Sequence, residues 1–273
     1  MAKRKQSPFW NSLTAYLLAW KRAPTLAGAV RMAAGWQTSA SARPAEQPSV
    51  PSSPNPLLEY FEAHVEGRGI WKWRHYFEAY HGHLSKFVGR EVHILEIGVY
   101  SGGSLEMWKH YFGPQCKIYG VDLEPACEVY ADESVRIFLG DQADRSFWKR
   151  VKQEVPLLDI VIDDGGHKPH QQIVSLEELL PHLRSGGVYV CEDVQGISQR
   201  FADYVSGLVH SLNATSITKK AGSVEQLAST ATPFQAAVHS IHSYPFLTVI
   251  EKTTAPMDEF VAPKHGTQWQ PFL

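Results

Sequence analysis

The chain has 273 residues, of which 44% are hydrophobic and 20% are charged, and its formal net charge is −2. This is an ordinary globular composition with enough apolar residues for one large core, and no apolar run approaches the roughly 20 residues of a membrane span. The balanced charge argues against a nucleic-acid-binding protein, which is usually basic overall or in one patch. The cysteines, Cys116, Cys127 and Cys191, are odd in number and lack metal-site spacing, so they indicate free thiols in a reducing, cytoplasmic compartment.

The N-terminal segment differs from the rest of the chain. No acidic residue precedes Glu46, whereas lysine and arginine recur throughout this stretch. Large apolar side chains fall at helical spacing at Trp10, Leu13, Leu17 and Trp20. The pattern predicts a basic amphipathic helix.

Several roles remain open for this helix and for the linker that follows it. Residues 37–56 are rich in Ser, Ala and Pro, which is typical of a flexible linker. A basic amphipathic helix can lie on a membrane surface, dock on a partner or act as an organellar presequence. It can equally be an extension that packs on the main domain or on a second subunit. We therefore divide the chain into an extension, residues 1–56, and a globular domain, residues 57–273.

Helical and strand patterns alternate in the globular domain. Helices are expected at 57–65, 72–87, 104–112, 145–154, 171–183 and 199–212, and strands at 93–98, 117–123, 135–140, 158–163, 187–192, 236–243 and 246–252. Such alternation predicts an α/β fold with a mostly parallel, doubly wound sheet covered by helices on both faces. The last two strands are joined only by Tyr244-Pro245, which leaves no room for a crossover helix, so they must be antiparallel to each other.

Two neighbouring strands end in paired acids. Asp163 and Asp164 close the apolar run from Leu158, and Glu192 and Asp193 close the run from Val188. Carboxyl ends of parallel strands face one crevice, so these four side chains are expected together, with His167 above them after a Gly-Gly turn. Carboxylate oxygens suit a hard divalent cation, and an imidazole suits a general base. The arrangement predicts a reaction centre.

The first strand of the sheet ends in a glycine-containing turn. Glu96, Gly98 and Gly102 form the spacing Glu-x-Gly-x-x-x-Gly, and Ser104 is placed to cap the next helix. Glycine lets a backbone pass close to a ligand. The spacing Gly-x-Gly-x-x-Gly that a dinucleotide pyrophosphate needs is absent, which argues against NAD or FAD.

Polar residues also follow strands two and three. Asp122 is suited to accept from both hydroxyls of a ribose, and Asp141 and Gln142 are suited to an adenine edge. Each feature alone is weak, because an acid after a strand usually belongs to a loop or caps a helix. The ordered set after strands one to four predicts a nucleoside-containing cofactor.

These motifs resemble the Rossmann-like S-adenosylmethionine-dependent methyltransferases. The segments 95–105, 140–142, 162–167 and 192–193 are similar, in particular, to the metal-dependent O-methyltransferases of macrolide sugars, of the mycinamicin and macrocin types. They are also similar to the related rhamnosyl O-methyltransferase and cephalosporin hydroxylase group. The resemblance covers roughly residues 57–252.

The resemblance implies a seven-stranded sheet whose last strand is antiparallel, and it suggests assembly into a homo-oligomer. It implies that S-adenosylmethionine is held by Glu96, Gly98, Gly102, Asp122 and Gln142. It implies Mg²⁺, or another hard divalent cation, on Asp164, Glu192 and Asp193, with His167 as general base and Asp163 near the sulfonium. The expected acceptor is a small molecule, the hydroxyl of a sugar or glycoside.

The chain departs from the family pattern in two places. Gly166 stands where the family often has serine, and Trp71-Lys72 replaces its Asp-Lys segment, so no cofactor-capping role is assigned to Lys72 or His75.

Two other functions were weighed. A non-catalytic, cofactor-binding scaffold that recruits a partner through its N-terminal tail is the main alternative, although a scaffold needs no complete acid set. An iron(II) oxygenase usually shows two histidines and one carboxylate, whereas this centre has one histidine among carboxylates.

Overall fold

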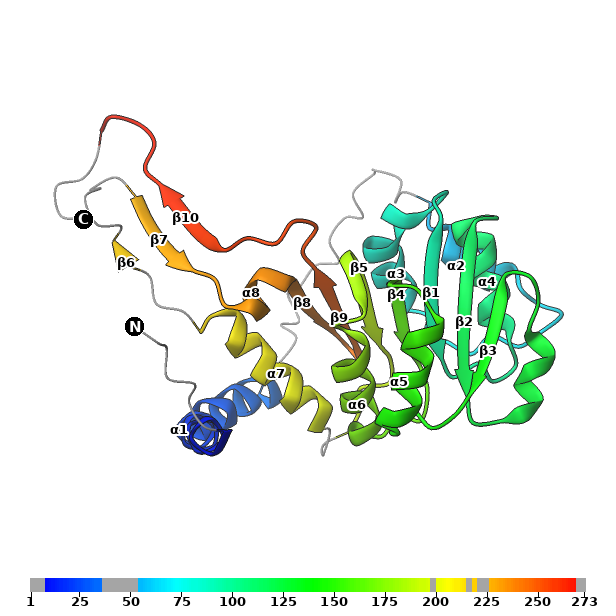
Figure 1. Ribbon diagram of the computed structural model, residues 1–273, viewed down its shortest axis with the longest axis horizontal. Coiled ribbons are helices and arrows are strands. Elements are labelled where there is room, and N and C mark those ends of the chain that lie inside the picture. The colour runs from blue at the N-terminus through cyan, green and yellow to red at the C-terminus, as the bar shows by residue number, and fades with distance from the viewer. Residues whose placement is uncertain (1–7, 36–53, 197–199, 215–217, 220–225, 269–273) are drawn as a thin grey trace. The chain divides into compact units, whose positions relative to one another are not determined.

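The computed structural model describes residues 8–35, 54–196, 200–214, 218–219 and 226–268 (Figure 1). The chain divides into two units, Met1–Ser53 and Pro54–Leu273. The linker expected at 37–56 lies almost entirely outside the described residues.

The described part of the first unit is a single helix, α1 (Pro8–Ala34). It agrees with the helical spacing of the apolar residues between Trp10 and Trp20. Its first turn has no acid, and its last turn carries Arg31, which interacts favourably with the negative end of the helix dipole. Within the described residues, no helix is both long enough and apolar enough to cross a membrane.

The second unit is built on a seven-stranded sheet (Figure 1). Its strands, in spatial order, are β3 (Val135–Leu139), β2 (Cys116–Asp122), β1 (Val92–Ile97), β4 (Leu158–Asp163), β5 (Leu183–Cys191), β9 (Leu247–Lys252) and β8 (Val238–Tyr244). The first five are parallel, and β9 is antiparallel to both β5 and β8. The predicted mostly parallel sheet with an antiparallel last strand is therefore confirmed.

Helices cover both faces of this sheet. They are α2 (Pro56–Ala63), α3 (Tyr76–Leu84), α4 (Gly103–Phe112), α5 (Arg145–Glu154), α6 (Pro169–Leu179) and α7 (Arg200–Leu212), with short 3₁₀ turns η1 (Ser85–Phe87) and η2 (Pro125–Tyr130). Successive residues of β1 serve opposite cores: Ile94 packs with α2, α3 and α4, and Leu95 packs with α5, α6 and α7. Because successive strand side chains alternate between faces, both faces of the apolar strands are buried.

The structure departs from the predicted elements near the C-terminus. The strand expected from Ala236 begins at Val238, because a short helix, α8 (Pro233–Ala237), precedes it. A capping box between Thr232 and Gln235 fixes that helix start. A small antiparallel sheet, with order β10 (Glu259–Pro263), β7 (Gln226–Thr230) and β6 (Thr218–Lys219), was not predicted.

The helix expected at 72–87 also starts later. Residues 69–73 form an extended strap ahead of α3, and η1 completes the helical region after it. Because α3 begins at Tyr76, Lys72 and Trp73 lie in the strap rather than in the helix, and their side chains point toward the sheet.

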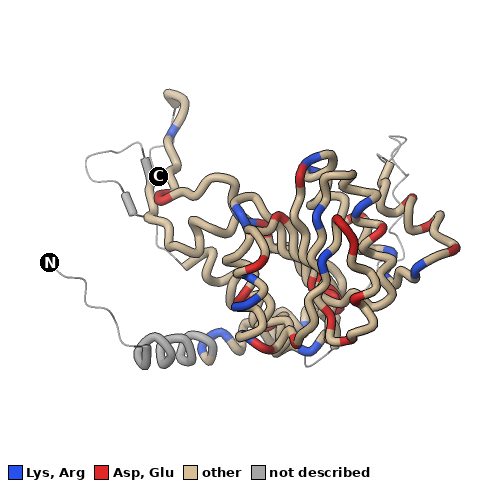
Figure 2. The backbone as a smooth tube through the Cα atoms, turned by 45° about the vertical axis from the view of Figure 1, so that its right-hand side comes forward, with Lys and Arg blue, Asp and Glu red and all other residues tan. Residues whose placement is uncertain are grey.

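Figure 2 shows that basic and acidic positions are interspersed over the second unit. The strand order changes direction between β1 and β4, where successive crossovers leave in opposite directions. In open α/β sheets, ligands bind beyond the carboxyl ends of the strands at such a switch point.

Candidate active site

A cavity of about 940 Å³ lies at this switch point. It is bounded by the ends of β1, β2, β4 and β5 and by the strap 69–73. The predicted site residues that line it are Gly98, Asp122, Asp141, Gln142, Asp164, His167, Glu192 and Asp193. The fold thus brings three of the four paired acids, Asp164, Glu192 and Asp193, to one cavity with His167 and Asp122. Three predicted cofactor residues, Glu96, Gly102 and Asp163, are not on its wall.

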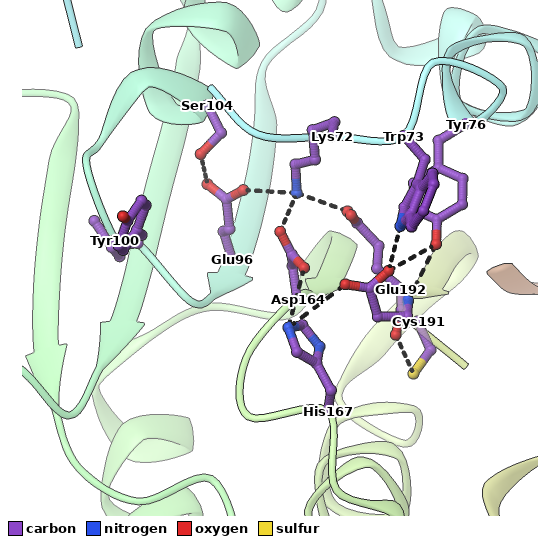
Figure 3. A network of polar contacts seen from close by, with 12 residues as sticks. Lys72, Trp73, Tyr76, Glu96, Tyr100, Ser104, Asp164, His167, Cys191 and Glu192 are labelled. Atoms are coloured by element: carbon purple, nitrogen blue, oxygen red, sulfur yellow. Dashed lines mark hydrogen bonds and ion pairs between the residues drawn. The ribbon is translucent and has the colours of Figure 1, made fainter. Parts of the chain in front are cut away.

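Lys72 lies at the centre of the acidic end (Figure 3). Its Nζ donates to Asp164 Oδ2 at 2.6 Å and to Glu192 Oε1 at 2.8 Å, and it lies 3.8 Å from Glu96 Oε1. The Lys72 side chain is only 2% exposed. One ammonium group therefore neutralises part of the charge of three acids, which lie at the ends of β1, β4 and β5.

This position keeps Lys72 charged. Burial alone would lower the pKa of the lysine, but the carboxylates of Asp164, Glu192 and Glu96 together raise it above its ordinary value. Burial raises the pKa of Glu192, reinforced by Asp164, while Lys72 opposes that shift. Lys72 and Glu192 therefore stabilise each other's buried charge, since an unpaired buried charge costs several kcal/mol.

Asp193 is held by the same strap. Its Oδ1 accepts from Trp73 Nε1 at 2.8 Å and from Tyr76 OH at 3.0 Å, and its backbone N–H donates to Tyr76 OH at 3.2 Å. Tyr76 OH also lies 3.0 Å from the Phe246 carbonyl oxygen, which places the start of α3 against the β8–β9 turn.

The second oxygens of two carboxylates, those of Asp164 and Asp193, face the imidazole of His167. His167 Nε2 lies 3.9 Å from Asp164 Oδ1 and 3.6 Å from Asp193 Oδ2. Ligand atoms of these three residues all lie within 4.8 Å of one another. The side chain of His167 is 40% exposed, so the group is open to the cavity. Two oxygens and a nitrogen thus converge on one point, while Glu192 is turned to Lys72.

The backbone is strained at the same place. Non-glycine residues with positive φ are rare, and His167 and Asp193 both have φ of 53°. Tyr100, which also lines the cavity, has φ of 49°. Such conformations cost about 1–3 kcal/mol each and cluster at functional sites, where the surrounding structure imposes them.

Asp122 forms the opposite end of the cavity. Its Oδ2 accepts from the backbone N–H groups of Val99 and Tyr100 at 2.9 and 3.1 Å, and its Oδ1 accepts from Glu124 N–H at 2.9 Å. Burial alone would raise the pKa of Asp122, but these backbone donors hold it below its ordinary value of 3.8. The carboxylate is thereby fixed and ionised at the end of β2.

Gln142 and Asp163 form a buried support beneath the Gly-Gly turn. Gln142 donates to Asp163 Oδ1 at 3.0 Å and to Ser175 Oγ at 3.1 Å, and it accepts from Gly166 N–H at 2.7 Å. Asp163 also accepts from Tyr189 OH at 3.0 Å and is 1% exposed. Because Asp163 points away from Asp164, as strand alternation requires, it does not reach the cavity and holds Gln142 instead.

Glu96 and the glycines also take supporting positions. Glu96 is fully buried and accepts from Ser104 Oγ at 3.0 Å and from Trp108 Nε1 at 3.2 Å. A Cβ atom on Gly102 would lie 2.9 Å from the Tyr130 ring, and one on Gly98 would lie 2.1 Å from the Asp164 carbonyl. Close approach of neighbouring parts of the chain is by itself enough to require glycine at both positions.

Lys72, Trp73 and Tyr76 were not among the predicted site residues. A signal was present: the Trp-Lys-Trp run places a lysine between two large apolar residues just before a helix. A lysine in such a setting is buried only when paired, and the unpaired acids of the reaction centre were its available partners.

Comparison with known proteins agrees with the fold. The 8-demethyl-8-(2-methoxy-alpha-L-rhamnosyl)-tetracenomycin-C 3'-O-methyltransferase of Streptomyces olivaceus is 36% identical over 151 residues, covering 52% of this chain and 38% of the relative. The mycinamicin VI 2''-O-methyltransferase of Micromonospora griseorubida is 41% identical over 123 residues, covering 42% of this chain and 30% of the relative. No family model matches the chain.

Among solved structures, the MycE methyltransferase from the mycinamycin biosynthetic pathway, in complex with Mg, SAH and mycinamycin VI, matches with a TM-score of 0.59 and 25% identity. The match covers 73% of this chain and 54% of that one. The second unit therefore has the Rossmann-like methyltransferase fold. The chain is a homologue of the sugar O-methyltransferases of natural-product pathways, as the motifs predicted, and it spans about half or less of the length of these relatives.

Proposed function

We propose that the protein is an S-adenosylmethionine-dependent, divalent-metal-assisted O-methyltransferase that acts on a hydroxyl of a sugar or glycosylated natural product. One observation carries this proposal. A single cavity joins the fixed Asp122 carboxylate at one end to the Asp164, His167 and Asp193 cluster at the other. A nucleoside cofactor and a hydroxyl acceptor can therefore meet within one enclosed space.

The cofactor end fits S-adenosylmethionine. Asp122 is ionised, anchored by backbone donors and exposed to the cavity, as a ribose contact requires. Asp141, Gln142 and Gly98 also line this cavity, and Asp141 and Gln142 are the residues that would contact an adenine. When bound, the cofactor supplies a methyl group on a sulfonium, which an oxygen nucleophile can displace in line.

The acidic end fits a hard divalent cation. Asp164 Oδ1 and Asp193 Oδ2 are turned to one point, and their other oxygens are held by Lys72, Trp73 and Tyr76. Carboxylate oxygens without cysteine suit Mg²⁺ better than zinc. A bound cation would stabilise the alkoxide form of the acceptor. Glu192, the third predicted ligand, already accepts from Lys72 at its Oε1.

His167 is the base in this proposal. The imidazole is open to the cavity and lies within 4 Å of both carboxylates. It is placed to take the proton of an acceptor hydroxyl bound at Asp164 and Asp193. Positioned general bases contribute typically 10²–10⁴-fold to a rate. Alignment of acceptor and cofactor in one cavity supplies the remaining main contribution, through proximity.

The test is methyl transfer from isotopically labelled S-adenosylmethionine to a panel of rhamnosylated and other glycosylated acceptors, with Mg²⁺ or with a chelator. We expect product only with the metal, and a loss of roughly 10²–10⁴-fold in kcat for His167→Ala. His170→Ala is the matched control, since His170 is exposed and lies three positions further along the chain. Cofactor binding without transfer to any acceptor would instead favour a non-catalytic scaffold.

A further inference from the structure

A second cluster of metal-type ligands lies away from the cavity. It consists of His83 in α3, His242 in β8 and Glu251 in β9, whose ligand atoms all lie within 4.8 Å of one another. None of the three lines the active-site cavity. The cluster is mostly enclosed: His83 is 8% exposed, and the other two are half-buried.

The donor atoms of this cluster are already turned toward one another. His83 Nδ1 and Glu251 Oε1 share a hydrogen bond of 2.5 Å, and the rings of His83 and His242 have centroids 4.5 Å apart. Zinc bonds to nitrogen and oxygen are about 2.0–2.2 Å, so ligand atoms around one tetrahedral ion lie roughly 3.3–3.6 Å apart. Small side-chain rotations reach that spacing from the observed one.

Neighbouring groups orient the ligands from outside. Ser240 Oγ lies 2.9 Å from His242 Nε2, so among the contacts of the described residues Nδ1 is the nitrogen of that ring left for a cation. Tyr244 OH lies 2.9 Å from His83 Nε2, and Lys86 Nζ donates to Glu251 Oε2 at 3.0 Å. Metal-binding histidines usually have their second nitrogen fixed by such an outer partner.

We propose that His83, His242 and Glu251 form a zinc site that clips α3 to the β8–β9 hairpin. Two imidazoles and one carboxylate are a zinc ligand set, whereas Mg²⁺ prefers oxygen ligands. The cation takes the place of the proton shared by His83 Nδ1 and Glu251 Oε1, so that proton is released to solvent on binding. Lys86 remains on the outer oxygen of Glu251 and balances its charge.

The proposed zinc site lies on the same helix and hairpin that hold the active-site strap 69–73. At the other end of the same helix and hairpin, Tyr76 OH lies 3.0 Å from the Phe246 carbonyl oxygen, and His75 Nε2 lies 2.8 Å from the Pro245 carbonyl oxygen. Trp73 packs on Phe246 with ring centroids 5.4 Å apart. Zinc at the far end therefore stabilises the junction on which the strap 69–73 rests, without contacting the reacting groups.

Calorimetric titration of the full chain with ZnCl₂ in excess Mg²⁺ tests the proposal. The wild type should bind zinc at this site and release protons, and the bound equivalent should be lost in His242→Ala and in Glu251→Gln. His239→Ala is the matched control, because it removes an exposed histidine of the same strand and should keep that equivalent. At zinc concentrations about 100 times Kd, the melting temperature should rise by roughly 5–10 °C in the wild type and the control only.

Zinc bound equally by wild type and His242→Ala would place it elsewhere and overturn the proposal. No zinc binding by the wild type would also overturn it and would leave the cluster as a hydrogen-bonded ion pair. Asp193→Asn separates the two candidate metal centres, since it should leave the zinc equivalent of the clip unchanged.

Discussion

The Nζ atom of Lys72 lies 2.6 Å from Oδ2 of Asp164, although the two residues are 92 positions apart in the chain. Lys72 belongs to the strap ahead of α3, and Asp164 follows the central strand β4. The contact closes the cavity on the side opposite Asp122. It also supplies the positive charge that allows Glu96, Asp164 and Glu192 to coexist in a dry site.

Replacing Lys72 with methionine should destabilise the fold. The variant keeps the apolar stem but leaves buried carboxylates without a counter-charge, which costs about 3–5 kcal/mol. Urea unfolding measures the difference, and added Mg²⁺ should recover part of it. Lys109→Met is the control, since the Lys109–Asp132 pair is exposed and should contribute less than about 1 kcal/mol. Equal losses in the two variants would contradict the account.

Gly98→Ala should be far more damaging than Gly89→Ala. Both glycines have positive φ, so both variants incur backbone strain. Only at Gly98 does the added Cβ meet a neighbour, the Asp164 carbonyl at 2.1 Å, whereas nothing lies within 4 Å at Gly89. We expect roughly 1 kcal/mol for Gly89→Ala and several kcal/mol for Gly98→Ala, measured by denaturant unfolding. Similar values would mean that the close approach of β1 and β4 is not required.

The cysteines should be unreactive in the native protein. Burial raises the pKa of Cys116 to about 12 and that of Cys127 to about 11, and it raises the pKa of Cys191 well above its ordinary value. The thiolate is the reactive form, so a disulfide reagent at pH 8 should modify the folded chain very slowly. The same reagent in denaturant should titrate all three thiols. Rapid labelling of the native protein would be inconsistent with this packing.

Acid stability should depend on Asp122. Its folded-state pKa lies below the ordinary value of 3.8, so its contribution is fully present above that value. The contribution is lost as the pH falls further, through the depressed pKa of the folded state, because the unfolded state then binds more protons. Unfolding free energies measured from pH 5 to pH 2 should fall less steeply for Asp122→Asn than for wild type. Parallel curves would show that the backbone donors do not stabilise the carboxylate.

Much of the fold is predictable from sequence, because the buried strands are continuous apolar runs bounded by turn residues. The apolar stretch that ends at Asp163 predicts a buried parallel strand. The tight Tyr244-Pro245 turn predicts an antiparallel pair, because it leaves no room for a crossover helix. The small sheet of β6, β7 and β10 was not predicted, because β7 pairs with β10 across 29 to 37 residues of sequence and the segments show no strong alternation.

The acids that line the cavity were predictable from the sequence, but the buried residues that hold them in place were not. Acids that follow neighbouring parallel strands must converge, which places Asp122, Asp164 and Asp193 correctly around one cavity. Whether an acid at a strand end faces the cavity or the interior depends on where the strand stops and on its partners. Asp163 therefore packs under Gln142, and Lys72 enters from a strap whose path no local pattern defines.

Binding of S-adenosylmethionine tests the central claim most directly. Calorimetric titration of the full chain with the cofactor, in the presence of Mg²⁺, should show one site, and Asp122→Ala should weaken the affinity by at least about tenfold, since a lost charged hydrogen bond is worth roughly 1.5–3 kcal/mol. The exposed Asp144, at the start of α5, provides the control variant Asp144→Ala, which should bind as wild type does. No binding by the wild type, or equal binding by Asp122→Ala, would contradict the assignment of this cavity to the cofactor.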